Sequence, residues 1–218
     1  MSSFFNMDNG FFVVLSKICD IFFLSVIWLV FCIPIITIGP ANTALYYATV
    51  KVLRRERGYI FREFFKSFKL NFKRAAIIGV IITAFFVVLL LDIYAAWADL
   101  SGNSNVSSIM FGIYMAMTFF LLTISIYIFP ILSRFDMTVR QLFKTACFMA
   151  LRHLPFTLLM LIVTVAALFG MYIIPLLTFI TPVALTLINS LLMERIFKKY
   201  MPKSNENEEN SKDEWYLE

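Results

Sequence analysis

The feature that most constrains the fold is a run of forty residues, 154–193, that contains no charged side chain. As one helix this run would extend for about 60 Å at 1.5 Å per residue, which is twice the thickness of a bilayer core. The run therefore predicts two membrane spans. Gly and Pro at 170–175 mark the turn between them, which gives spans over 155–171 and 175–193.

The composition of the chain agrees with a membrane protein. Of its 218 residues, 61% are hydrophobic and only 15% are charged, which is too apolar for an ordinary soluble domain. In lipid, only helices and closed barrels satisfy every backbone polar group, and continuous rather than alternating apolar runs select helices. We therefore expect an all-α integral membrane protein.

Three further apolar runs predict spans over 10–38, 74–97 and 106–132, so the expected fold is a five-span helical bundle. Residues 1–200 would form this single transmembrane domain. The tail that follows, 201–218, is polar and low in complexity, and we expect it to be disordered.

The first span is expected to end near Ile38. Gly39 can adopt the left-handed conformation that closes a helix, and Pro40 has no backbone N–H to continue one, so these two residues form the predicted break. An amphipathic helix over 41–57 would follow, with Pro40 at its first turn, and would lie along the membrane surface. A second would cover 60–73, and another amphipathic, basic segment lies between the third and fourth spans.

The helix over 60–73 carries two sets of side chains at helical spacing, aromatic on one side and basic on the others. These residues are Phe61, Phe64, Phe65, Phe68 and Phe72, with Arg62, Lys66, Lys69 and Lys73. The aromatic side chains would enter the membrane interface while the cations contact headgroups. The alternative is that this surface docks into a soluble or membrane partner.

The basic residues predict the orientation. Segment 51–74 holds nine of the nineteen Lys and Arg residues, segment 134–152 holds four, and the chain from Arg195 onward holds five. In the five-span layout all eighteen fall on one side, which the positive-inside rule makes cytoplasmic. We therefore expect a multi-pass protein of the bacterial cytoplasmic membrane, with its amino terminus outside and its carboxyl terminus inside.

The remaining cation, Lys17, lies inside the first apolar run together with Asp20. The two residues are three positions apart and so share one face of a helix, where they can form an electroneutral pair. Ionisable residues inside a membrane are also candidates for a substrate or proton site, and the sequence leaves both interpretations open.

No constellation for catalysis, cofactor binding or metal binding is visible. The chain has one histidine, His153, and it lacks the HExxH and GxxxxGK[ST] patterns. Its three cysteines show no CxxC spacing. The basic residues lie beside the spans, so a membrane surface explains them better than nucleic acid does. We expect a protein that is not an enzyme.

Three segments together resemble the YesL family of bacterial membrane proteins. They are PIITIGPA at 34–41, FFKSFKLNF at 64–72 and FPILSRF at 129–135, and the similarity extends over residues 1–200. The resemblance implies a family of unknown activity, found mainly in Gram-positive bacteria and often encoded beside carbohydrate importers of the ATP-binding cassette type. It implies no catalytic or ligand-binding residue.

Two functions remain open. The first is a non-enzymatic accessory protein that supports or regulates such an importer, contacting its permease subunits through the cytoplasmic basic and aromatic segment. The second is a small transporter or channel for a small solute, acting as a homo-oligomer, with its helix breaks near a pathway. In both, the lipid bilayer is the surrounding partner.

Overall fold

The protein is described here by a computed structural model that covers residues 10–99 and 105–200. The described residues form helices, with no strand among them, which confirms the predicted all-α class. In chain order the elements are α1 (Gly10–Cys32), η1 (Ile35–Thr37), α2 (Ile38–Ala48), η2 (Thr49–Arg54), α3 (Ile60–Asp99), α4 (Asn105–Arg134), α5 (Val139–Arg152), α6 (Leu154–Ile173), η4 (Pro175–Phe179) and α7 (Thr181–Phe197). Elements η1 and η4 are 3-10 helices, and η2 is a π-helix. The tail 201–218 lies outside the described residues.

Four stretches of the described helices are long and apolar enough to cross a membrane: Leu15–Cys32, Ile60–Asp99, Val106–Arg134 and Leu154–Ile173. The fifth predicted span, 175–193, is not confirmed. It is divided between η4 and α7, and α7 has 17 residues. The physical reason is that prolines stand in the first turns of both pieces, where each begins a helix that the preceding one cannot continue.

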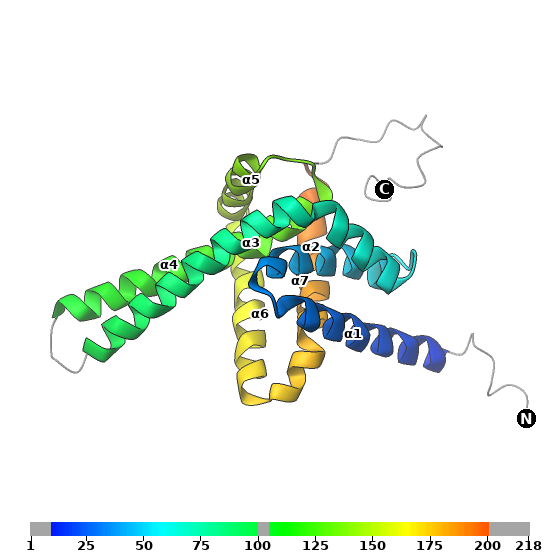
Figure 1. The fold of residues 1–218 in the computed structure, drawn as a ribbon, viewed down its shortest axis with the longest axis horizontal. Helices are drawn as coiled ribbons and strands as arrows, with labels where there is room; N and C mark the ends of the chain where they lie inside the picture. The colour runs from blue at the N-terminus through cyan, green and yellow to red at the C-terminus, as the bar shows by residue number, and fades with distance from the viewer. Residues whose placement is uncertain (1–9, 100–104, 201–218) are drawn as a thin grey trace, which may run out of the picture.

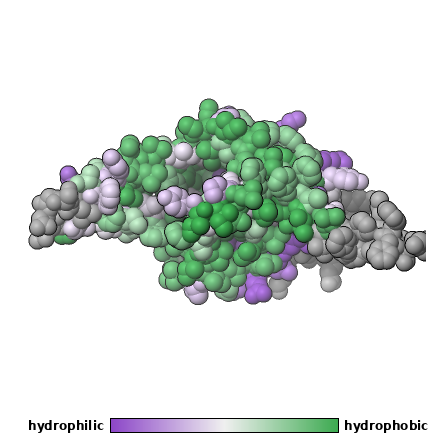
Figure 2. All heavy atoms as spheres, turned by 90° about the horizontal axis from the view of Figure 1, so that it is seen from below, coloured by the Kyte–Doolittle hydropathy of each residue, from purple (hydrophilic) through white to green (hydrophobic). Residues whose placement is uncertain are grey.

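The outer surface of the molecule is strongly apolar. Large hydrophobic side chains are exposed along α1, the second half of α3, the first half of α4 and α6. Figure 2 shows apolar residues covering most of the face seen from below, with hydrophilic residues gathered mainly toward one end. Exposed apolar area of this extent is typical of helices whose solvent is lipid.

The break after the first span lies earlier than expected. Helix α1 ends at Cys32, and Pro34, which disfavours helical geometry at the residue before it, then opens η1. Gly39 and Pro40 do not break a helix, because they lie in the first turn of α2, and Gly39 has no positive φ. Proline is tolerated there because the first N–H groups of a helix have no intrahelical acceptor.

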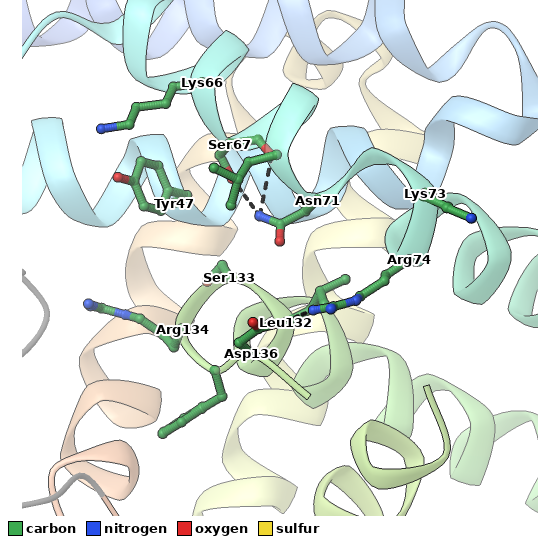
Figure 3. Close-up of a pocket in the computed structure, with 12 residues that line it drawn as sticks. Tyr47, Lys66, Ser67, Asn71, Lys73, Arg74, Leu132, Ser133, Arg134 and Asp136 are labelled. Carbon is green, nitrogen blue, oxygen red and sulfur yellow. Dashed lines mark hydrogen bonds and ion pairs between the residues drawn. The ribbon is translucent and has the colours of Figure 1, made fainter. Parts of the chain in front are cut away.

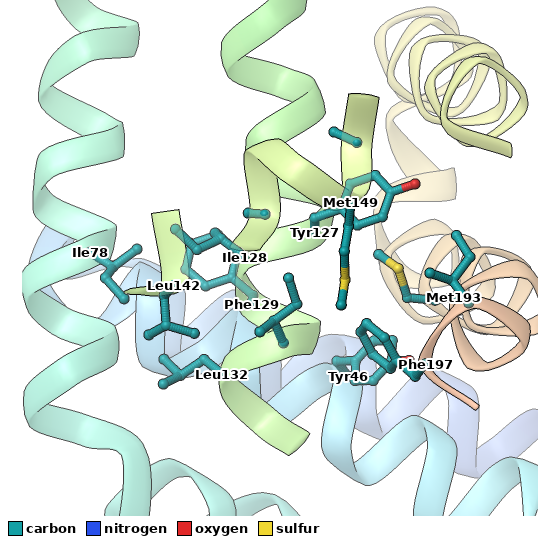
Figure 4. Packing of buried hydrophobic residues seen from close by; sticks show 14 of the residues in the cluster. Tyr46, Ile78, Tyr127, Ile128, Phe129, Leu132, Leu142, Met149, Met193 and Phe197 are labelled. Atoms are coloured by element: carbon teal, nitrogen blue, oxygen red, sulfur yellow. The ribbon is translucent and has the colours of Figure 1, made fainter. Parts of the chain in front are cut away.

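Helix α2 is a buried central helix rather than the start of a surface helix over 41–57. Leu24 of α1 and Phe64 of α3 pack with one side of it. The opposite side, with Tyr46, belongs to a second cluster that draws side chains from α3 to α7. Figure 4 shows this cluster, which includes Tyr46, Ile78, Tyr127, Ile128, Phe129, Leu132, Leu142, Met149, Met193 and Phe197.

The contact between α2 and α3 is so close that it requires glycine on both helices. A Cβ atom at Gly39 would lie 2.0 Å from the carbonyl oxygen of Ala75, and one at Gly79 would lie 2.7 Å from the Cα atom of Gly39. Backbone groups cannot move aside as a flexible side chain can. Small residues of this kind allow helices in membranes to approach closely.

The helix predicted over 60–73 and the span predicted over 74–97 are one continuous helix, α3, of 40 residues. Its length of about 60 Å is twice that of a bilayer core, so only part of it can lie in hydrocarbon. In Figure 1, α3 and α4 form a long hairpin, while α6 and α7 form a second pair that runs in a different direction. The helices therefore do not form one parallel bundle.

Candidate functional site

The four cations predicted on α3 form one exposed row, and we call Arg62, Lys66, Lys69 and Lys73 the cationic row. Each of the four residues is exposed. Their spacings of four, three and four residues place them on one face of the helix. This part of α3 thus presents positive charge to its surroundings.

The aromatic stripe predicted beside these cations is largely an internal packing surface. Phe64 is fully buried and Phe68 is 9% exposed. Their rings, with that of Phe65, surround Phe31 of α1 at centroid distances of 4.9 to 5.8 Å. The stripe therefore fixes α3 against α1 and is not free for a partner. Phe61 and Phe72, at its two ends, are exposed.

A cavity of about 520 Å³, which we call the basic pocket, lies between α3 and the end of α4. Its lining residues are Tyr47, Lys66, Ser67, Leu70, Asn71, Lys73, Arg74, Leu132, Ser133, Arg134, Phe135 and Asp136. In Figure 3, Lys66 and Arg134 lie on the side of Tyr47, whereas Arg74 and Asp136 lie on the other side and Lys73 points away.

Neutral polar groups lie between these two sides of the basic pocket. The amide nitrogen of Asn71 donates to the carbonyl oxygen and the hydroxyl of Ser67, at 3.3 and 3.4 Å. The amide oxygen of Asn71 is on the side of Ser133 (Figure 3). The pocket therefore combines several cations with hydroxyl and amide groups, which is the chemistry that binds an anionic group.

Behind the pocket, Arg134 belongs to a buried charge network centred on Glu194 of α7. An Nη atom of Arg134 lies 2.6 Å from one carboxylate oxygen, and an Nη atom of Arg55 lies 3.5 Å from the other. The hydroxyl of Tyr46 donates to Glu194 at 2.9 Å. Burial, together with the Glu194 charge, raises the pKa of Tyr46. The network joins α2, α4 and α7.

Sequence reasoning missed this network. Glu194 is the first charge after the forty-residue uncharged run, and it is the sole carboxylate among the basic residues that follow directly. A single carboxylate next to several basic residues at the end of an apolar run was the one sequence feature that could have indicated a buried ion pair. Its partners come from segments up to 148 residues away, and their proximity depends on the tertiary fold.

A second buried ion pair joins η2 to the start of α3. The Nζ atom of Lys51 lies 2.8 Å from Glu63, and the two residues are 8% and 6% exposed. Burial alone would lower the pKa of Lys51, but its hydrogen bond to Glu63 and the nearby Tyr47 outweigh burial and raise it. Lys51 is therefore a structural cation and not part of an open surface.

The predicted pair of Lys17 and Asp20 is replaced by a different contact. The Nζ atom of Lys17 lies 2.5 Å from Glu56, which precedes the turn at Gly58. This hydrogen bond lowers the pKa of Glu56. The chain folds back between α1 and η2, so the early part of α1 lies beside the basic segment. This contact argues against the prediction that Lys17 faces the opposite side of the membrane from this segment.

A separate cavity of about 210 Å³ lies among α2, α4, α6 and α7, and we call it the polar cavity. Its polar lining residues include Asn42, Ser125, Thr164, Thr186 and Asn189. Asn189 donates to Thr164 at 3.4 Å, while its own buried amide oxygen accepts no hydrogen bond within the described part of the chain.

Asn42 reaches the polar cavity from α2, and its amide oxygen accepts a hydrogen bond of 2.9 Å from the indole N–H of Trp28. The residue is thus held in place by α1. Within residues 10–99 and 105–200, no group of three His, Cys, Asp or Glu side chains is arranged to hold a metal ion.

Comparisons with known proteins agree with the resemblance to the YesL family that the sequence motifs indicated. The family described as "Protein of unknown function, DUF624" matches residues 21–93. An uncharacterized protein of Bacillus subtilis (strain 168), YesL, is 24% identical over 143 residues. That match covers 63% of this chain and 65% of YesL, so the chain spans less than two thirds of its curated relative. No solved structure shows a significant match.

Proposed function

We propose that this YesL-like membrane protein is a non-enzymatic accessory protein that supports or regulates a carbohydrate importer of the ATP-binding cassette type. The resemblance supports the choice of importer, since genes of the family often lie beside such systems. In this proposal the protein lies in the bacterial cytoplasmic membrane, and its basic segments face the cytoplasm.

The observation that carries the proposal is the exposed cationic row on a helix that is held rigidly. Phe64 and Phe68 fix α3 against α1, and the Lys51–Glu63 pair fixes its first turn. Arg62 and Lys69 then extend outward from a fixed backbone. Such a row suits an acidic surface on a permease subunit, because complementary charge steers association and selects partners.

Affinity purification from native membranes tests this proposal. The wild-type chain should recover permease subunits, and the double variant Arg62→Glu with Lys69→Glu should not. Lys144→Glu reverses an exposed cation on α5 and serves as the matched control, with recovery unchanged. If no transporter subunit is recovered with the wild type, and deletion of the gene leaves sugar uptake unchanged, the proposal is wrong.

A second candidate function is a small oligomeric transporter or channel for a small solute. The polar cavity supports it, because Asn42 and Asn189 place amide groups among otherwise apolar helices. The predicted Lys17–Asp20 pair no longer supports it, since Lys17 contacts Glu56. Purified protein in liposomes should then transport a solute, and Asn189→Leu should stop the flux. Flux that Asn189→Leu leaves unchanged would exclude the cavity as its route.

A further inference from the structure

A groove lies on the same face of α3 as the basic pocket. The pocket uses Ser67, Asn71 and Arg74, and the spacing of three and four residues continues through Ile78 to Ile82 and beyond. One face of α3 therefore carries a polar section followed by an apolar section. Both sections face α4.

The apolar section is a groove of about 570 Å³, which we call the apolar groove. It is lined from α3 by Ile81, Phe85 and Leu89, and from α4 by Met117, Phe120 and Ile124, among others. Arg74 and Ile81 are seven residues apart, which is about 10 Å along the helix axis. Both helices contain candidate membrane spans, so the groove lies where acyl chains are available.

The charges of the basic pocket favour an anion. Its lining contains four cationic side chains, but Lys73 points away (Figure 3) and Arg134 is neutralised by Glu194. Lys66 and Arg74 remain, against the single carboxylate of Asp136. Arg74 contacts Asp136, but the side chain of Asp136 is 86% exposed, so this pair contributes little stability. Arg74 can therefore turn to another anion at low cost.

We infer that this face of the α3–α4 hairpin binds one anionic phospholipid, with the phosphate in the basic pocket and an acyl chain along the apolar groove. Lys66 and Arg74 contact the phosphate from opposite sides (Figure 3). The Ser133 hydroxyl donates to Pro130 and the Asn71 amide nitrogen to Ser67, so the oxygens of Asn71 and Ser133 accept hydrogen bonds from the headgroup hydroxyls. The ligand is a lipid rather than a soluble phosphate because the apolar groove continues from the pocket and can hold an acyl chain. The cationic row of the proposed accessory function shares Lys66 and Lys73 with the pocket, but that function is tested at Arg62 and Lys69, which do not line it, so the two proposals can fail separately.

Native mass spectrometry of the full chain in a neutral detergent tests the inference. With dioleoylphosphatidylglycerol added, the wild type should retain one lipid, whereas dioleoylphosphatidylcholine should be retained far less. Lys66→Gln and Arg74→Gln should each weaken retention about fivefold, which is the usual attraction of one cation to an anionic surface. Asp136→Asn should strengthen it, because the one carboxylate is removed.

Lys69→Gln is the matched control, because Lys69 is exposed on the same helix and does not line the pocket. This variant should retain the lipid as well as the wild type does. Lys66 is itself exposed, so its substitution should not disturb folding, and a thermal melt checks this. Equal retention of the two lipids, or equal effects of Lys66→Gln and Lys69→Gln, overturns the inference. So does competition by glycerol 3-phosphate at the concentration of the lipid, because the apolar groove would then contribute nothing.

Discussion

Glu194 is the single residue with the largest expected effect on stability. It is 3% exposed, accepts hydrogen bonds from Arg134 and Tyr46, and forms an ion pair with Arg55. Glu194→Gln keeps the shape but leaves buried guanidinium charge uncompensated. We expect a loss of about 3 kcal/mol, near the lower end for breaking a buried pair, because the amide oxygen still accepts from Tyr46. Thermal or denaturant unfolding in detergent measures it.

Glu56→Gln is the control for this prediction. Glu56 also contacts a cation, Lys17, but the two side chains are 67% and 44% exposed, and pairs open to solvent contribute little. The Glu56→Gln variant should melt at a temperature close to that of the wild type. A loss of stability in Glu56→Gln as large as that in Glu194→Gln would contradict the assignment of the buried network.

His153 is the only histidine in the chain, so its titration can be followed without ambiguity. Burial, and then the charges of Lys199 and Arg152, lower its pKa from the ordinary value of 6.5. The unfolded chain therefore binds a proton more readily than the folded one, and His153 should reduce stability as the pH falls below 6.5.

NMR titration of the imidazole protons should give a pKa below 6.5 for the folded protein. His153→Gln should remove this part of the acid destabilisation and leave stability at pH 8 nearly unchanged, apart from the loss of the 3.2 Å contact with Tyr200. A folded-state pKa above that of an unfolded peptide would reverse the sign and contradict the prediction.

At the scale of elements, the crossing of α2 and α3 is the contact that should tolerate larger side chains least. Gly39→Ala and Gly79→Ala each place a Cβ atom within 3 Å of backbone atoms of the other helix. Overpacking of this kind costs about 1–3 kcal/mol or more, because the helices must separate. Gly112→Ala on α4 is the control, since no atom lies within 4 Å of its added Cβ.

Melting temperatures of the three variants in the same detergent check this prediction. The two crossing variants should melt well below the wild type, and Gly112→Ala should melt at or slightly above it, because alanine favours a helix over glycine. Equal melting of Gly39→Ala and Gly112→Ala would show that the two helices are not in backbone contact.

Local patterns predicted helices well and their partners poorly. The apolar runs predicted α4 and α6 within a few residues, because length and hydropathy are local properties. The spacing of Phe64 and Phe68 was identified correctly, yet their partner, Phe31, is thirty-three residues or more away in sequence, so periodicity could not distinguish lipid from α1. Pro40 was correctly placed in the first turn of a new helix, but the end of the first span was placed at Gly39 and Pro40 instead of before Pro34.

The candidate site was predictable only in part, for the same reason. The cationic row follows from helical spacing on one element. The basic pocket also needs Arg134 and Asp136 from α4 and the chain after it, about sixty residues away. Nothing in the sequence alone pairs those residues with Asn71, because tertiary contacts between helices leave no periodic pattern.

For the whole molecule, the contacts bring the basic segments together. Arg55 and Arg134 meet at Glu194, Arg74 meets Asp136, and Lys17 meets Glu56. We expect residues from all of these segments to face the same side of the membrane. That arrangement differs from a simple up-and-down bundle, because α1 and α2 form a hairpin that returns to the side on which it began.

Single-cysteine labelling checks this arrangement. In a background in which Cys19, Cys32 and Cys147 are serine, Lys17→Cys and Lys69→Cys should react with a membrane-impermeant maleimide from the same side. Trp97→Cys, near the far end of α3, should react from the opposite side and serves as the control. Labelling of Lys17→Cys from the side of Trp97→Cys would contradict the hairpin.

The π-helix at Thr49–Arg54 has a consequence for how the chain could vary. A π-helical turn holds one residue more than an α-helical turn, and such turns often mark functional sites. Removing one residue from this segment would restore α-helical winding over nearly the same number of turns, so the chain after it would keep its orientation relative to α2. Arg54 and Arg55 would still face Ser190 and Glu194 of α7. Removing a residue from the α-helical part of α2 would instead rotate everything after it by about 100°, and these cations would turn away. The π-helical turn is therefore the place where this segment can change its length by one residue without misdirecting the cations that hold α2 to α7.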